Sequence, residues 1–306
     1  MPAIVANDLT KRYGRIRGVE DLDLEVRPGE VFGFLGPNGA GKTTTIRLLL
    51  GFIRPTRGKA AILGLDCRRQ SAAVRRRVGY VPGEYALYES LTGDQLLRFI
   101  AGLRGGTDPA KIHDLAERLN CDLRRPIREL SHGNKQKICI IQAFMNRPEV
   151  LLLDEPTTGL DPLVQQEFFR LVAEAQAAGR TVLFSSHVLS EVERVCQRVA
   201  IIRDGRILKV STVSELKAKT LRRLAVTFAG AAPEGIFARN AQVRDVVVEG
   251  SRLSCTVRGP LDPVLKTLAG YEVEDLLSNE PSLEEVFLAF YNEDCDAARR
   301  VPENPA

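Results

Sequence analysis

A glycine-rich segment between an apolar run and a helical pattern has the composition of a phosphate-binding loop. Residues 36–43 read Gly-Pro-Asn-Gly-Ala-Gly-Lys-Thr, which fits the spacing G-x-x-x-x-G-K-[ST]. Glycines let successive backbone N–H groups face phosphate oxygens, and the N-terminus of the following helix adds its positive dipole end. Lys42 would reach the β- and γ-phosphates of a nucleotide, and the Thr43 hydroxyl would bind Mg²⁺. The strand pattern before the loop and the helix pattern after it favour this site over an ordinary glycine-rich turn.

Two carboxylates follow a second apolar run. Residues 150–153 are Val-Leu-Leu-Leu, and Asp154 and Glu155 come directly after them. A continuous apolar run of this length is typical of a strand buried on both faces of a parallel sheet. Asp154 could hold Mg²⁺ through its water shell, and Glu155 could polarise an attacking water. His187 follows another such run and could contact a γ-phosphate, although a histidine considered alone is more often structural.

The patterns around these segments predict an α/β domain with an inserted helical block. Residues 4–13 and 19–26 alternate as strands do, which suggests an antiparallel flap beside the parallel sheet. Tyr13 ends the first of them and is the best candidate to stack on a purine base, because the chain has no tryptophan. From Thr92 to Pro148 the apolar positions follow a helical period, without an intervening strand pattern.

After residues 211–220 the pattern changes, and a small α+β region is expected. Asp204-Gly205 is a strong hairpin signal at the end of the first domain. Pro281-Ser-Leu-Glu-Glu285 fits a capping box, in which Ser282 caps a helix and Glu285 reaches back. The segments expected to form strands and a short helix are 224–228, 243–248, 253–257 and 263–269.

Composition limits the class of protein. The chain has 306 residues, of which 27% are charged and 44% hydrophobic, and its formal net charge is +4. This modest positive charge gives no argument for a nucleic-acid partner. No apolar run reaches the ~18 residues that a membrane span needs, so a cytosolic protein is expected. Its six cysteines are scattered without a metal-binding spacing and are expected to be reduced thiols.

A third motif carries a family resemblance. Residues 130–136, Leu-Ser-His-Gly-Asn-Lys-Gln, are similar to the Leu-Ser-Gly-Gly-Gln signature of the ATP-binding cassette (ABC) transporter ATPases. Ser131 and Gly133 match the signature, while His132 and Asn134 depart from it. Considered alone, the motif is a helix N-terminus capped by Ser131, with N–H groups suited to a phosphate. Together with Glu155 and the following Thr-Thr-Gly-Leu-Asp, it identifies residues 3–215 as resembling that family.

The resemblance implies that two cassettes close head to tail around two ATP molecules. Ser131 and Gly133 of one chain would then complete the site of the other, and Asp161 would lie at the seam, besides capping a helix. Lys42, Glu155 and His187 would be catalytic, and Thr43 and Asp154 would hold Mg²⁺. The nucleotide-binding residues would be Tyr13, Gly36, Pro37, Asn38, Gly39, Ala40, Gly41, Lys42, Thr43, Thr44, Ser131, Gly133 and Asp161.

One departure from the family pattern lies after residues 80–82. The family usually has a glutamine there that touches Mg²⁺ and the lytic water, whereas this chain has Gly83 followed by Glu84. Either Glu84 substitutes, or the loop couples to a partner without touching the metal. Slow hydrolysis is expected in both cases.

The expected fold class is α/β: a P-loop NTPase core (mixed sheet with antiparallel flap) with an inserted helical subdomain, plus a small C-terminal α+β domain. The ATPase domain would cover residues 1–215, with the helical subdomain at about 84–148. The extension would cover 221–292, followed by a flexible tail over 293–306. The extension resembles that of exporter-type ATPases of the drug-resistance group, where it would support dimerisation or regulation or act as a passive brace.

The expected function is that of an ATP-hydrolysing subunit that homodimerises and drives a separate membrane permease in export. Such a protein would be cytoplasmic and peripheral at the inner face of the cell membrane, with ATP and Mg²⁺ as cofactors and no nucleic-acid partner. Two alternatives remain: a non-transport ABC ATPase acting on ribosomes or DNA, and a regulatory module with slow turnover. The transported substrate cannot be deduced from this chain, because its recognition would reside in the permease.

Overall fold

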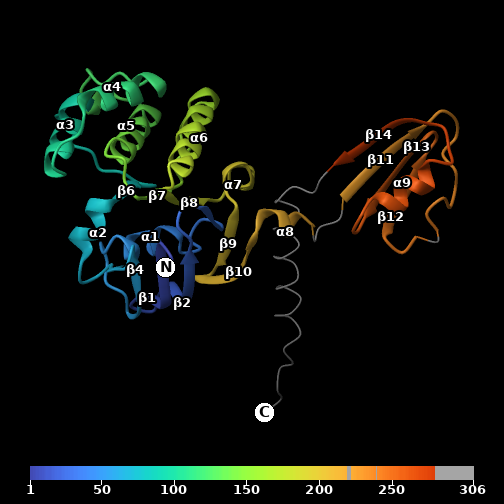
Figure 1. Ribbon diagram of the computed structural model, residues 1–306, viewed down its shortest axis with the longest axis horizontal. Helices are drawn as coiled ribbons and strands as arrows, with labels where there is room; N and C mark the ends of the chain where they lie inside the picture. The colour runs from blue at the N-terminus through green and yellow to red at the C-terminus, as the bar shows by residue number, and fades with distance from the viewer. Residues whose placement is uncertain (219–221, 239, 280–306) are drawn as a thin grey trace, which may run out of the picture. The chain divides into compact units, whose positions relative to one another are not determined.

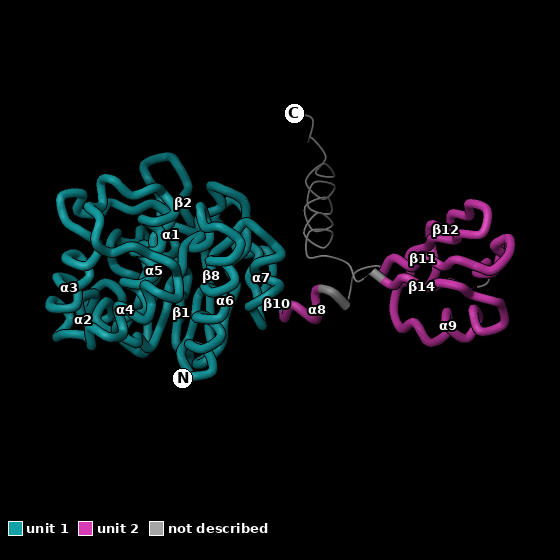
Figure 2. The backbone as a smooth tube through the Cα atoms, turned by 90° about the horizontal axis from the view of Figure 1, so that it is seen from above, with its two compact units in different colours: residues 1–211 teal, residues 212–306 magenta. Residues whose placement is uncertain are grey.

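The computed structural model describes residues 1–218, 222–238 and 240–279. The chain divides into two compact units, residues 1–211 and 212–306 (Figure 2). The description ends at residue 279, so the expected capping box at 281–285 and the expected tail over 293–306 lie outside the described residues. Within the described part of the chain, no helix has both the length and the apolarity that a membrane crossing requires.

A six-stranded sheet forms the centre of unit 1. Its strand order is β10-β9-β3-β8-β7-β6, and β3 pairs in parallel with both β8 and β9. Strands β3, β7 and β8 are buried along their whole length, as the continuous apolar runs predicted. The bounds are β3 Val31–Leu35, β6 Val78–Val81, β7 Val150–Asp154, β8 Thr181–Ser186, β9 Arg198–Arg203 and β10 Arg206–Thr212.

A second, antiparallel sheet corresponds to the expected flap. Its order is β2-β1-β4-β5, and Ile4 of β1 pairs with Val26 of β2 on one side and with Ile62 of β4 on the other. It is hydrogen-bonded separately from the central sheet. The bounds are β1 Ile4–Tyr13, β2 Ile16–Val26, β4 Arg57–Ile62 and β5 Leu65–Asp66.

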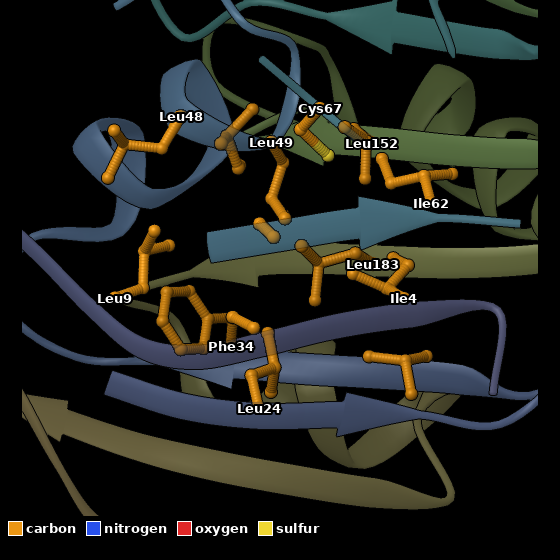
Figure 3. Close-up of a cluster of buried hydrophobic side chains, with 14 of the residues drawn as sticks. Ile4, Leu9, Leu24, Phe34, Leu48, Leu49, Ile62, Cys67, Leu152 and Leu183 are labelled. Carbon is orange, nitrogen blue, oxygen red and sulfur yellow. The ribbon is translucent and has the colours of Figure 1, made fainter. Parts of the chain in front are cut away.

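The main core lies between the two sheets and includes one face of α1 (Lys42–Leu49). Phe34, Leu152 and Leu183 come from the central sheet, Ile4 and Leu24 from the flap (Figure 3). Each of these side chains is at most 3% exposed, and burial of such a side chain contributes about 1.5–3 kcal/mol. This core fixes the start of α1, and hence the glycine-rich loop before it, against the carboxyl ends of β7 and β8.

The expected helical block is present. Helices α3, α4 and α5 stand together, with α6 beside α5 (Figure 1). Thr92 and Gln95 form a capping box at the start of α3, and Asp108 caps α4. The helix bounds in unit 1 are α2 Ser71–Arg77, α3 Gly93–Leu103, α4 Pro109–Arg118, α5 His132–Phe144, α6 Pro162–Ala177 and α7 Leu189–Val195, and a 3₁₀ turn covers Ile127–Glu129.

The arginines at the end of α2 contact other segments of unit 1. The Arg75 guanidinium donates to the Leu50 carbonyl at 3.0 Å and lies over the Phe52 ring. Arg77 forms a bidentate pair with Glu149 and holds the pKa of that carboxyl below its ordinary value. Arg77 therefore ties α2 to the segment that precedes β7.

The described cysteines agree with the expectation of reduced thiols. Cys67, Cys121, Cys139, Cys196 and Cys255 are buried and form no disulfide. Burial raises the pKa of the Cys139 thiol to about 12, so this group remains protonated near neutral pH.

Unit 2 has a four-stranded antiparallel sheet of order β12-β13-β11-β14. One face packs on α9 through a small core that includes Val226, Leu253 and Val264. The last strand, β14, was not expected: its sequence Val-Glu-Asp-Leu-Leu-Ser-Asn does not alternate, and only pairing with β11 makes it a strand. The bounds are α8 Val213–Ala218, β11 Arg222–Phe228, β12 Val243–Glu249, β13 Arg252–Val257, α9 Asp262–Leu268 and β14 Val273–Asn279.

Candidate functional site

The candidate site lies at one edge of the central sheet. Because β3, β6, β7 and β8 are parallel, their carboxyl ends meet there. The loops that leave these strands contain the glycine-rich segment, Gly83, Glu155 and His187. In open α/β sheets this edge is where ligands bind.

The glycine-rich loop requires glycine for steric and conformational reasons. Gly41 has φ +109°, and a Cβ at this position would lie 2.7 Å from the Gly18 carbonyl oxygen. At Gly36 a Cβ would lie 2.4 Å from the Ile202 carbonyl oxygen. Helix α1 begins at Lys42, directly after Gly41, and no side chain caps its first N–H groups. These uncapped donors suit an anion.

The three residues expected to be catalytic lie together. Lys42 is 5% exposed, and its Nζ lies 3.2 Å from Glu155 Oε1. The other Glu155 oxygen lies 3.1 Å from His187 Nδ1. Lys42 also donates to the carbonyls of Gly36 (2.6 Å) and Pro37 (3.0 Å), so it lies back along its own loop. Glu155 therefore contacts both Lys42 and His187, and a γ-phosphate could exchange with these contacts.

Asp154 has the environment of a metal-binding carboxylate. It is fully buried, and its Oδ1 accepts a hydrogen bond from the Ser185 hydroxyl at 2.6 Å. Its Oδ2 is buried without a hydrogen-bond partner among the described residues. An unpartnered buried carboxylate oxygen is costly unless a cation or its water binds there. The residues present therefore fit Mg²⁺.

The loop after β6 brings Gly83, and not Glu84, to the Asp154 carboxylate. A Cβ on Gly83 would lie 3.4 Å from Asp154 Cγ and Oδ2. The Glu84 side chain is 93% exposed and lies 4.0 Å from Arg47. These positions disfavour the alternative in which Glu84 substitutes for the usual glutamine of the family.

We expect Gly83→Gln to raise the hydrolysis rate several-fold. The backbone at Gly83 has no positive φ, and the Cβ contact with Asp154 is an ordinary one, so a Cβ fits at this position. The glutamine amide could then reach the unpartnered Oδ2 and an attacking water. Steady-state phosphate release measures the effect. Gly83→Ala, which adds only the methyl group, is the control, and equal rates for the two variants would contradict the expectation.

A shallow pocket of about 270 Å³ extends from the glycine-rich loop to the end of β1, with Tyr13, Lys42, Thr43, Thr44 and Glu155 in its lining. Tyr13 is 43% exposed, and Lys11 Nζ lies over its ring, 5.1 Å from the centroid. Ile16 and Arg17 also line this pocket, and the sequence analysis did not identify them. Their place at the start of β2, directly after the turn that follows Tyr13, was the available signal.

The signature residues lie elsewhere on the same chain. Ser131 caps α5 by accepting from the Asn134 N–H, and it is exposed. A Cβ on Gly133 would lie 2.4 Å from the Gly159 carbonyl oxygen, so this glycine lets the loop after β7 pass close to α5. Asp161 caps α6 by accepting from the Val164 N–H at 3.0 Å. Ser131, Gly133 and Asp161 are not among the residues that line the pocket beside Tyr13.

Tyr85 and His132 join the loop after β6 to the signature. The Tyr85 hydroxyl donates to the His132 carbonyl at 2.8 Å and lies 2.9 Å from its Nδ1. Neither residue was expected to act in the site.

Two further polar residues support the site and were missed. Ser185 binds Asp154, and both its carbonyl and its hydroxyl accept from the Glu155 N–H. Gln136 is 2% exposed and donates to the Pro156 carbonyl at 2.9 Å, which joins α5 to the loop after Glu155. A serine at the end of an apolar strand was a signal for the first. The second has no local signal, because a glutamine in a helix is ordinary.

A parallel sheet with a glycine-rich loop after β3, an uncapped helix start and a buried aspartate at the end of β7, two strands away, defines a P-loop NTPase. Comparison with known proteins agrees. Residues 19–158 match the family model described as ABC transporter. A solved structure titled as the ATP-binding subunit of an ABC transporter is 32% identical, covering 70% of this chain and 92% of that one, with a TM-score of 0.64.

The relatives give the family. The daunorubicin resistance ATP-binding protein DrrA3 of Streptomyces coeruleorubidus is 36% identical over 98% of both chains. The ABC transporter ATP-binding protein YbhF of Escherichia coli is 36% identical over 71% of this chain, which spans only 38% of that relative's length. The bacitracin transport ATP-binding protein BcrA of Bacillus licheniformis is 38% identical over 72% of this chain and 73% of its own. The chain thus belongs to the ATP-binding proteins of the ABC transporter family, and the predicted family and fold class are confirmed.

Proposed function

We propose that this ABC ATPase binds ATP in the pocket beside Tyr13 and hydrolyses it to drive export through a separate membrane permease. The observation that carries the proposal is that Glu155 contacts both Lys42 and His187, while the preceding residue, Asp154, has a buried, unpartnered oxygen. Relatives named for daunorubicin resistance and bacitracin transport support export as the process.

The geometry supports a role for each of these side chains. Lys42 would exchange its carbonyl contacts for the β- and γ-phosphates. A cation near the bridging oxygen stabilises the negative charge that develops there during transfer of the γ-phosphoryl group. Glu155, released from Lys42, would orient the attacking water and take its proton. His187 would contact the γ-phosphate from the end of β8. Mg²⁺, held by Thr43 and Asp154, would neutralise phosphate charge.

The exposed start of α5 supports a composite site. Ser131 lies outside the pocket of its own chain, and its helix has an exposed N-terminus. Such a terminus favours an anion. A second copy, approaching head to tail, would present Ser131 and Gly133 to the γ-phosphate held by Lys42. A solved structure of another ATP-binding cassette, 20% identical with a TM-score of 0.64, is dimeric and bound to ADP and phosphate, which supports dimerisation here.

A permease partner is supported by an exposed apolar group on the helical block. Tyr88, Phe99 and Leu103 are 63%, 52% and 68% exposed, and the first two rings pack edge to face. Phe99 and Leu103 are one helical turn apart on α3. Docking there would hold the cassette at the cytoplasmic face of the membrane.

A complementation experiment tests the composite site. Lys42→Ala removes the phosphate contact of one half-site, and Ser131→Asp keeps a helix cap while placing negative charge against the phosphate of the other. Each variant alone should be inactive, because both of its sites are damaged. An equimolar mixture forms a mixed dimer with one intact site, so ATPase activity should rise several-fold above that of either variant.

Ser131→Asn, which caps without the charge, is the matched control and should retain activity. A mixture no more active than its components would contradict the composite site. If Ser131→Asp hydrolysed ATP normally, the signature would have no part in the reaction. ATP binding by the wild type without turnover would instead favour the regulatory module.

A further inference from the structure

A glutamate outside the nucleotide pocket joins the two segments that carry Glu155 and His187. Glu191 lies in the first turn of α7, and one of its oxygens accepts from the Thr157 hydroxyl at 2.6 Å. The other oxygen accepts from the Ser186 hydroxyl at 2.8 Å. Thr157 and Ser186 are 5% and 2% exposed, so these bonds are shielded from water. Bonds to an ionised acceptor are the strong ones.

Each hydroxyl is next to a residue of the proposed reaction. Thr157 follows Glu155 by two residues, and Ser186 directly precedes His187. The Glu155 and His187 side chains lie 3.1 Å apart, and Glu155 has a left-handed backbone with φ +46°. A non-glycine residue in this conformation persists only where its surroundings hold it. The carboxylate of Glu191 joins these two segments through its hydrogen bonds with Thr157 and Ser186.

The bonding pattern requires a carboxylate. Both partners are hydroxyl donors, and the Ser186 oxygen already accepts from the Val188 N–H at 2.9 Å. An amide offers only one acceptor oxygen, so a glutamine at this position would leave one hydroxyl proton without its present acceptor. Substitution of Glu191 by glutamine therefore preserves size but breaks one side of the bridge.

We propose that Glu191 is a positioning residue, which holds Glu155 and His187 in register for attack on the γ-phosphate without touching nucleotide. The inference rests on the proposed function, and it concerns the rate of the chemical step rather than ATP affinity. A misplacement of about 1 Å at a reacting group costs up to ~100-fold in rate. The effect should therefore fall on kcat and spare KM.

The test compares full-length variants. Glu191→Gln and Thr157→Val should each lower kcat roughly tenfold to a hundredfold, with KM and ATP affinity unchanged. Thr157→Ser restores the hydroxyl and should recover the wild-type rate. The double variant Glu191→Gln/Thr157→Val should be no slower than the worse single one, because both remove the same bridge. Ser190→Ala, at an exposed position of the same helix, is the matched control and should have the wild-type rate.

A second measurement does not depend on turnover. The chain has three histidines, so the imidazole NMR signals of His113, His132 and His187 can be assigned by substitution. Glu191→Gln and Thr157→Val should shift the His187 signals in the nucleotide-free protein and leave those of His113 in place. Unchanged His187 signals, or a wild-type kcat in both variants, would overturn the inference. An inactive wild type with shifted His187 signals would overturn the proposed function and leave the positioning role supported.

Discussion

Glu155→Gln is expected to abolish most hydrolysis and to accumulate an ATP-dependent dimer. The amide keeps the size of the side chain but cannot take a proton from water, and loss of a general base lowers a rate by about 10²–10⁴-fold. The variant also removes the charge that lies 3.2 Å from Lys42, so Lys42 remains available to phosphate. ATP should then stay bound between two chains. Light scattering after gel filtration, with and without Mg²⁺-ATP, measures the dimer.

The same variant with ADP is the control, because ADP lacks the γ-phosphate that both chains would grip. The wild type with ATP should show less dimer than the variant, since hydrolysis reopens it. A Glu155→Gln protein that remains monomeric at saturating ATP would argue against the composite site, even if its hydrolysis were lost.

Lys42→Ala is expected to weaken ATP binding roughly tenfold to a hundredfold, because a hydrogen bond to a charged group contributes about 1.5–3 kcal/mol. The nucleotide-free protein loses the contacts of Lys42 to Gly36, Pro37 and Glu155 as well. Titration with a fluorescent ATP analogue measures the affinity, and a thermal melt checks that the variant is folded. Lys59→Ala, an exposed lysine on β4, is the control. Unchanged affinity in Lys42→Ala would show that the loop is not the phosphate site.

The fold was predictable from sequence wherever the burial of an element follows from its own residues. The apolar runs at β3, β7 and β8 are typical of buried strands, and each of these strands is buried along its whole length. Asp161 likewise predicted the start of α6, since a helix cap acts locally, and Pro162 is the first residue of that helix. By contrast, β14 is a strand because β11 offers it a partner, and no local pattern reports that.

The family motifs could be recognised from the residue types and their spacing in the sequence. These motifs are the glycine loop with Lys42, the carboxylates after β7 and the capped start of α5. Each motif lies within one short segment, so it can be recognised without knowing how the chain folds. Only the tertiary structure decided which of them meet. Lys42, Glu155 and His187 converge because parallel pairing of β3, β8 and β7 brings three distant strand ends to one edge. Gly83 faces Asp154, and Glu191 reaches both hydroxyls, for the same reason: contacts between segments depend on strand order and register, which no single segment encodes.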